Sequence, residues 1–163
     1  MFFIRTAGLR DIEPVRTLLA TTWHATYDDI YGKEKVSELT QAWHSVPALK
    51  QRMTKPRSEF IVCDDGAEIT GMAFVSQIDS ETSMLHQLYV RPSAQGQGVG
   101  KKLLIEVEAC FPDVRKIRLE VEEANDRAVA FYEREGFKQT GTTPDCGVKG
   151  SGIPAVIMEK VIW

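Results

Sequence analysis

The amino-acid sequence predicts a mixed α/β fold, with one β-sheet layer and helices on its faces. Three observations lead to this prediction. Several short runs rich in β-branched residues read as strands, whereas other stretches repeat apolar residues at helical spacing. Turn signals separate the early strands, so these are expected to pair as hairpins. The centre of the chain has a strand–helix–strand order, which requires a right-handed parallel crossover.

The first third of the chain is predicted to hold one strand and two helical regions. An aspartate can cap the first helix with its side chain. Because proline lacks a backbone N–H, we expect Pro47 to split the second helical region. The predicted elements are a strand at Phe2–Thr6, a helix from Asp11 to about Trp23 whose apolar spacing continues to Tyr31, and a helical region from Lys33 to about Met53.

The rest of the chain alternates strands with two further helices. A hairpin is predicted around Gly66, and Asn125 and Gly136 are suited to begin and end the last helix. The sheet therefore has six to seven strands and about four flanking helices, in one domain over residues 1–163. The predicted segments are strands within 59–78, 83–90, 116–123 and 153–163, helices at 100–111 and 126–137, and a loop at 141–152.

Composition and charge exclude several classes of protein. The formal net charge is −3 and the pI about 5.7, so no basic excess is present to bind nucleic acid. No apolar run reaches the roughly 20 residues that span a membrane, and the N-terminus does not resemble a secretory signal. The three cysteines are far apart and form no zinc-binding spacing with the histidines. We therefore expect a cytoplasmic protein with reduced thiols and no metal.

The stretch Leu88–Leu104, LYVRPSAQGQGVGKKLL, begins like a strand and ends like a helix. Glycines between the two let backbone N–H groups turn toward one point, and a helix N-terminus adds further N–H groups. This is a pattern that holds phosphate. The spacing fits neither a Walker A loop nor a dinucleotide-binding fingerprint, since the required residues are missing in every register.

The stretch does match the pattern Gln/Arg-x-x-Gly-x-Gly/Ala, as QGQGVG from Gln95 to Gly100. It resembles the coenzyme A pyrophosphate loop of the GCN5-related N-acetyltransferases (GNAT family), bacterial type. The later stretch NDRAVAFYEREGF, Asn125–Phe137, is similar to the second signature of that family. The two motifs lie in the family's order and separation, so the sequence is identified as a member.

The resemblance implies acetyl-CoA as the acetyl donor. In the family fold, a splayed parallel strand pair binds this cofactor, here the strand ending at Val90 and the strand holding Glu120. Leu88, Tyr89 and Val90 would pair with the pantetheine arm, and the Val90 N–H would polarise the thioester carbonyl. Asn125 and Tyr132 would also contact the cofactor. The pyrophosphate would be held by Gln95, Gly96, Gln97, Gly98, Val99, Gly100 and Lys101.

Two catalytic residues follow from the same resemblance. Tyr132 would protonate the departing thiolate, while Phe131 packs. Glu120 resembles the base of the ribosomal-protein N-terminal acetyltransferases, although a solvated strand face is the alternative. His86, an ordinary sheet histidine on the simpler interpretation, is a competing base and acceptor contact. A chain of ordered waters without a dedicated base stays open as well.

The aromatic stripe Trp23, Tyr27 and Tyr31 has two interpretations. Aromatic residues at helical spacing usually form core, but aromatics beside carboxylates also suit a protonated amine. The surrounding stretch TTWHATYDDIYG resembles polyamine acetyltransferases over a dozen residues only. These three residues and His86 are therefore candidate acceptor-binding residues, with the core as the alternative.

The predicted function is acetyl transfer to a primary amine of a polyamine-like or amino-acid-like small molecule, or of a peptide N-terminus. The amine would attack directly in a ternary complex, because no cysteine lies in either motif. A protein lysine acetyltransferase and a non-catalytic acetyl-CoA sensor are the alternatives. No nucleic-acid or membrane partner is expected. Pairing of two copies through the last strands stays open.

Overall fold

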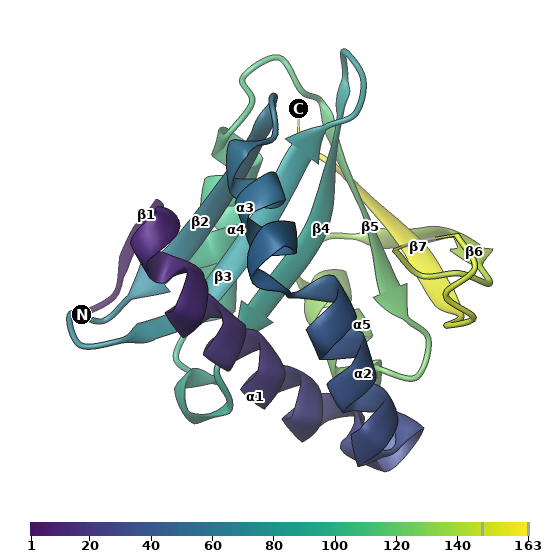
Figure 1. The fold of residues 1–163 in the computed structure, drawn as a ribbon. Helices are drawn as coiled ribbons and strands as arrows, with labels where there is room; N and C mark the ends of the chain where they lie inside the picture. The colour runs from purple at the N-terminus through teal and green to yellow at the C-terminus, as the bar shows by residue number, and fades with distance from the viewer. Residues whose placement is uncertain (148, 163) are drawn as a thin grey trace. The chain divides into compact units, whose positions relative to one another are not determined.

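The computed structural model describes residues 1–147 and 149–162. Within them, the chain forms seven strands in one mixed sheet, in the order β1-β2-β3-β4-β5-β7-β6 (Figure 1). The strands are β1 Phe3–Thr6, β2 Ser58–Asp64, β3 Ile69–Gln77, β4 Thr82–Val90, β5 Lys116–Glu122, β6 Lys138–Thr143 and β7 Ala155–Val161. The α-helices are α1 Ile12–Tyr31, α2 Lys33–Trp43, α3 Val46–Thr54, α4 Val99–Ala109 and α5 Asp126–Arg134, with short 3₁₀ turns at Leu9–Asp11 and Pro92–Ala94.

The predicted α/β class, the predicted parallel strand pair and the predicted split of the second helical region are confirmed, and one local bound needs correction. The region is two helices, α2 and α3, so the sheet is flanked by five helices in the described residues. Pro47 lies in the first turn of α3, where a helix needs no N–H, and the Ser45 side chain caps that turn by accepting from the Ala48 N–H at 3.2 Å. The predicted loop begins too early, because β6 extends to Thr143 by pairing with β7.

The chain divides into two compact units. One comprises residues 1–74 and 87–107, and the other comprises residues 75–86 and 108–163 as far as these are described. The strands β3 and β4 each contribute residues to both units. That residues 1–163 fold as one domain stays a prediction.

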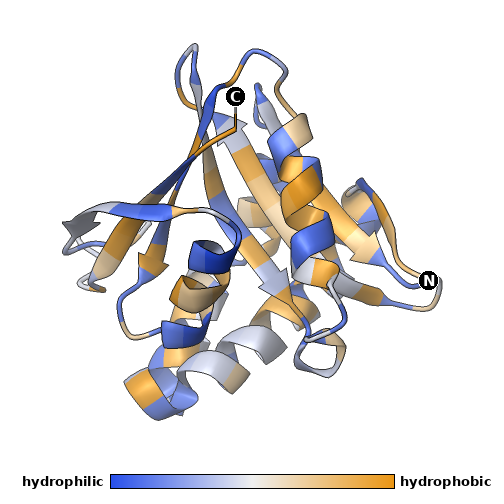
Figure 2. Cartoon of the chain, turned by 180° about the vertical axis from the view of Figure 1, so that it is seen from behind, coloured by the Kyte–Doolittle hydropathy of each residue, from blue (hydrophilic) through white to orange (hydrophobic). Residues whose placement is uncertain are grey.

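The first unit has helices on both faces of its strands. Figure 1 shows α1 and α3 in front of β2 and β3, with α4 behind. Met72 and Phe74 of β3 belong to a buried cluster with residues of α1 and α3, whereas Gly71 faces Leu103 of α4. Alternating residues of β3 thus pack against α1 and α3 on one side and against α4 on the other, as expected for a strand that is buried on both faces. The strands β2 and β3 are accordingly mostly hydrophobic (Figure 2).

An ion-pair network holds the start of this unit together. Arg5 on β1 donates from Nη1 to Asp11 Oδ2 at 2.8 Å and from Nη2 to Asp64 Oδ2 at 3.1 Å. Asp11 is buried, and the Arg5 hydrogen bonds hold the pKa of its carboxyl below the usual range. The network therefore joins β1, the first turn and the end of β2.

The second unit contains the parallel pair. β4 pairs with β5 from Thr82↔Lys116 to Leu85↔Leu119, and β5 pairs antiparallel with β7 along its whole length. Arg118 of β5 and Lys116 both bind Glu159 of β7, at 2.9 and 3.3 Å. The parallel step between β4 and β5 places α4 in the crossover connection, as the strand–helix–strand order predicts.

Candidate active site

The sequence-predicted site residues fall into two groups, one in each unit. The first unit holds the residues predicted to bind the cofactor arm and pyrophosphate, together with the aromatic stripe. The second unit holds His86, Glu120, Asn125 and Tyr132. Each group is described by itself.

The turn between β4 and α4 has the backbone geometry of an anion site. Gly96 and Gly98 adopt φ values of 81° and 83°, which side-chain-bearing residues rarely adopt. An added Cβ at either position would have no atom within 4 Å, so the turn is open around them. Helix α4 starts at Val99 directly afterwards.

The backbone N–H groups of this turn are available to donate hydrogen bonds to an anion. In the part of the chain that the structure describes, the backbone N–H groups of residues 96–101 have no hydrogen-bond partner. The next residue, Lys102, has a paired N–H, which donates to the Gly98 carbonyl at 3.1 Å. Unpaired N–H groups at a helix start favour a bound anion, and the helix dipole adds to this.

Packing fixes the turn in place. Val99 and Leu103 of α4 are buried, and a Cβ on Gly71 of β3 would lie 3.0 Å from both side chains and from the Tyr89 carbonyl oxygen. Only glycine lets α4 approach β3 and β4 this closely. Gln95 adds a second constraint, because its Nε2 donates to the Val90 carbonyl at 3.0 Å.

The aromatic stripe lies in a cluster of its own. Trp23 and Tyr27 are 2% and 1% exposed and pack with Val36, while Tyr31 is partly buried against them. The Trp23 ring lies 4.5 Å from Tyr27 and 6.2 Å from Tyr89, measured between centroids. This burial favours the core alternative for Trp23 and Tyr27, and leaves Tyr31 as the member of the stripe with an exposed surface.

Tyr132 is a buried phenol on the capped helix α5. Asn125 begins this helix by accepting the Ala128 N–H on its Oδ1 at 3.1 Å, and Gly136 follows its end with φ 97°. The Tyr132 ring packs against Phe131 and Phe137, at 5.2 and 5.5 Å. Burial raises the pKa of Tyr132 well above its ordinary value, and the Glu122 carboxylate raises it further. The phenol therefore stays protonated at neutral pH.

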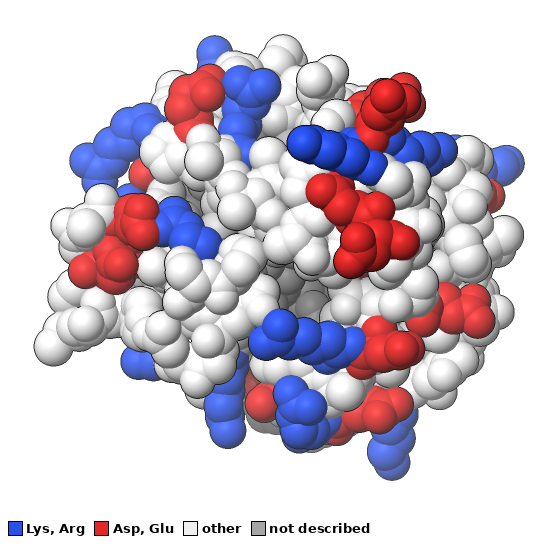
Figure 3. All heavy atoms as spheres, turned by 90° about the horizontal axis from the view of Figure 1, so that it is seen from below, with Lys and Arg blue, Asp and Glu red and all other residues white. Residues whose placement is uncertain are grey.

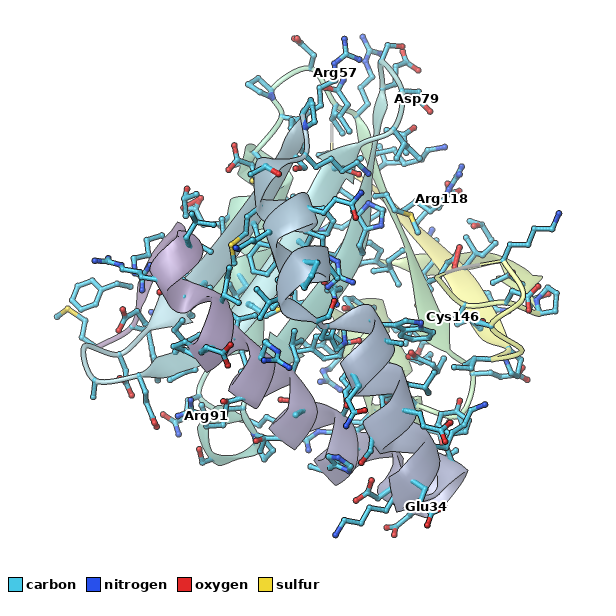
Figure 4. All side chains as sticks on the ribbon, viewed as in Figure 1. Glu34, Arg57, Asp79, Arg91, Arg118 and Cys146 are labelled. Carbon is cyan, nitrogen blue, oxygen red and sulfur yellow. The ribbon has the colours of Figure 1, made fainter. Side chains whose placement is uncertain are left out.

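Two carboxylates lie on one face of β5, since residues two apart on a strand point the same way. Glu120 is half-buried, and its Oε1 accepts the Gly147 N–H at 2.9 Å. Glu122 is 7% exposed and receives a hydrogen bond from the Cys146 thiol, which lies between β6 and β7 (Figure 4). Sequence reasoning missed Glu122, although its alternation with Glu120 was a usable signal.

His86 lies in the exposed part of β4 and its Nε2 is 2.6 Å from the Ser76 hydroxyl. Charges of both signs are interspersed over the face shown in Figure 3.

In residues 1–147 and 149–162, no group of three His, Cys, Asp or Glu side chains could hold a metal ion. No helix among these residues is long and apolar enough to cross a membrane.

Comparison with protein families identifies the class. The model described as "Acetyltransferase (GNAT) domain" matches residues 27–162, so the chain belongs to the GNAT family. It is an N-acetyltransferase, an acyl-transferring enzyme that uses acetyl-CoA.

Individual relatives agree with this class. The spermidine N(1)-acetyltransferase of Thermoplasma acidophilum is 26% identical over 144 residues, covering 85% of this chain and 89% of that protein. The N-alpha-acetyltransferase RimI of Mycobacterium tuberculosis is 29% identical over 97 residues, covering 58% and 61%. In fold, the chain resembles the PaiA N-acetyltransferase of Thermoplasma acidophilum, solved in complex with coenzyme A, with a TM-score of 0.87, 24% identity and 99% of each chain covered.

Proposed function

We propose that this enzyme acetylates a primary amine of a small molecule or of a peptide N-terminus, by direct attack of the amine in a ternary complex. The observation that carries the proposal is the turn of residues 96–101, in which the described residues leave the backbone N–H groups unpaired and Gly96 and Gly98 hold φ near 80°. These amides fit a diphosphate, and Lys101 adds a positive charge beside them.

The residues fit acetyl-CoA in roles that the family pattern suggests. Leu88, Tyr89 and Val90 would bind the pantetheine arm along β4, with the Val90 N–H donating to the thioester oxygen. Gln95, which already bonds the Val90 carbonyl, would position the end of that strand. Acetyl-CoA supplies an activated acyl group, and the protein supplies orientation and proton transfer.

Proton transfer is assigned to residues of the second unit. Tyr132 is protonated and buried, which suits an acid that donates to the departing thiolate. Glu120 is the proposed base. Its carboxylate is half-buried, and among the described residues it accepts one hydrogen bond, from the Gly147 N–H. His86 and ordered water are the competing bases, and Asn125 is proposed to contact the cofactor besides capping α5.

The acceptor class is inferred from the relatives. The names of the relatives point to different amine acceptors, among them spermidine, an α-amine and an aminoglycoside. All three are amines, so we infer an amine acceptor here. From the sequence-based expectation of reduced cysteines we also propose a cytoplasmic enzyme.

A screen for coenzyme A release tests the proposal. The protein is incubated with acetyl-CoA and with polyamines, amino acids, aminoglycosides and short peptides, and products are confirmed by mass spectrometry. We expect at least one amine to raise release above the hydrolysis rate. Binding of acetyl-CoA by calorimetry without release for any amine would contradict the proposal and favour a sensor.

A further inference from the structure

The junction between α2 and α3 holds an arginine that is partly buried and has no carboxylate partner. Arg52 donates from Nη2 to the Trp43 carbonyl and from Nη1 to His44 Nδ1, the latter at 3.2 Å. Among the described residues no Asp or Glu lies within 4.0 Å of its guanidinium nitrogens, whereas the other partly buried arginines each pair with one. These are Arg5, Arg16, Arg91 and Arg118.

His44, which contacts Arg52, and its neighbours Gln87 and Trp23 have buried polar atoms without partners among the described residues. His44 is 4% exposed, and its Nδ1 faces Arg52 and, at 3.5 Å, Gln87 Nε2. Burial, aided by the Arg52 charge, lowers the pKa of His44 to about 3, so the ring is neutral and carries its proton on Nε2. The described residues offer no partner to His44 Nε2, Trp23 Nε1 or Gln87 Oε1. Such atoms are costly when unpaired, which points to a ligand.

The junction adjoins the strand that we propose to carry the acetyl group. Gln87 and Tyr89 lie on one face of β4, and Val90 follows directly. Burial lowers the pKa of Arg52, and the nearby Tyr89 phenol opposes that shift. The Tyr89 ring also packs 6.2 Å from the Trp23 ring, which is itself 6.0 Å from His44.

A structural role accounts for only part of this arrangement. Arg52 and Arg16 bind the Trp43 and His44 carbonyls at the end of α2, where the helix dipole favours a cation. Arg16 is compensated by Glu13 at 3.2 Å, so the helix end already has one neutralised cation. Binding of these carbonyls at the end of α2 explains neither why Arg52 has no carboxylate partner among the described residues nor why the donors of His44 and Trp23 are unpaired there.

We propose that Arg52 and His44 bind a carboxylate of the acceptor, with Gln87 Nε2 positioning the His44 ring, so that the preferred acceptor is an amino acid or an amino-acid-like amine rather than a polyamine. Arg52 supplies charge and a planar pair of donors that match a carboxylate. The neutral His44 Nε2–H supplies a further donor. This inference rests on the proposed function, whose acceptor it narrows.

The test compares amines that differ only by the carboxylate: lysine with cadaverine, ornithine with putrescine, and tyrosine with tyramine. We expect kcat/KM to be about 10- to 100-fold higher for the carboxylate-bearing member of the productive pair. Arg52→Gln should lower kcat/KM for the carboxylate-bearing member about 10- to 100-fold more than for the other member, and so remove the preference. The matched control is Arg16→Gln, which removes a contact to the same end of α2 and should keep the preference.

A binding readout separates this inference from the proposed function. Tryptophan fluorescence reports on Trp23 and Trp43, and N-acetylglycine is titrated against its methyl ester. We expect the acid alone to change the signal, and Arg52→Gln to abolish that change. If no amine is acetylated but this response is present, the function fails and the carboxylate site stands. Preference for the decarboxylated amines, or an equal loss for both members in Arg52→Gln and Arg52→Lys, overturns the inference.

Discussion

Gly147 donates its backbone N–H to the Glu120 carboxylate over 2.9 Å, which ties the segment after β6 to β5. One carboxylate oxygen thus has a structural partner, and the proposed role as a base would use the other oxygen. The contact also explains why a polar residue is tolerated beside the buried Leu119 and Val121. A substitution at this position must therefore separate the structural role from the proposed role as a base.

Replacing Glu120 with Gln makes this separation. The amide oxygen can still accept the Gly147 N–H but cannot take a proton, so we expect kcat to fall by about 100- to 10,000-fold with little change in stability. Steady-state kinetics and thermal unfolding measure the two effects. Exposed Glu123 supplies the control, Glu123→Gln, which should match the parent. An unchanged kcat in Glu120→Gln would transfer the role to His86 or to water.

Tyr132→Phe removes one hydroxyl from a packed aromatic site. We expect kcat to fall by about 100-fold or more while the Kd for acetyl-CoA, measured by calorimetry, changes little. If Tyr132→Phe has the kcat of the parent, the Tyr132 phenol is not the acid.

The raised pKa of Tyr132 also makes a prediction about pH. Its folded pKa lies above the unfolded value of about 10, so its contribution to stability is complete below that pH and is lost as pH rises through the folded pKa. Ionisation of this phenol should therefore add no descending limb to the kcat profile between about pH 7 and 10. A descending limb in this range that disappears in Tyr132→Phe would contradict the raised pKa of this phenol.

Gly98→Ala tests the turn before α4. Space for a Cβ is present, but a φ of 83° is strained for alanine. We therefore expect the backbone strain to lower the free energy of unfolding by about 1–2 kcal/mol. We also expect weaker acetyl-CoA binding, because the amides lose their orientation. Gly8→Ala is the control, since Gly8 has φ −118° and should tolerate alanine. Equal acetyl-CoA affinity in Gly98→Ala and the parent would argue against the pyrophosphate assignment.

The lowered pKa of Asp11 predicts that the free energy of unfolding decreases in acid. Its pKa is held low by Arg5, so its contribution is present above the unfolded value of about 3.9 and is lost as pH falls through the folded pKa. Asp11→Asn should lower the free energy of unfolding at pH 7 by about 1.5–3 kcal/mol. Denaturant melts from pH 7 down to pH 3 should show a smaller pH dependence in the variant. Exposed Asp113→Asn should leave both quantities unchanged.

Local signals predicted much of the fold. The Asp65-Gly66 turn, the Asn125 cap and the glycines before α4 act over a few residues, and each lies where the sequence places it. Pro47 was interpreted as dividing the second helical region, and α3 does begin there, with Pro47 in its first turn. The extension of β6 to Thr143 was missed, because it depends on pairing with β7.

The residues of the carboxylate proposal could not be found from local patterns. Gln87 and His44 are 43 residues apart, and neither matches a motif. The missing partner of Arg52 is a property of its surroundings, because a sequence shows many acids and bases but not which of them meet. The Glu122–Cys146 contact is equally non-local, and only the alternation along β5 hinted at its first member.

The surroundings of Cys146 decide how the protein behaves toward thiol reagents. Burial and the neighbouring carboxylates raise the pKa of this thiol, so almost no thiolate forms at neutral pH. Alkylating agents and peroxide need the thiolate, and should therefore react with this sulfur very slowly. A fluorophore or spin label can consequently be attached at an engineered surface cysteine without protecting Cys146 first.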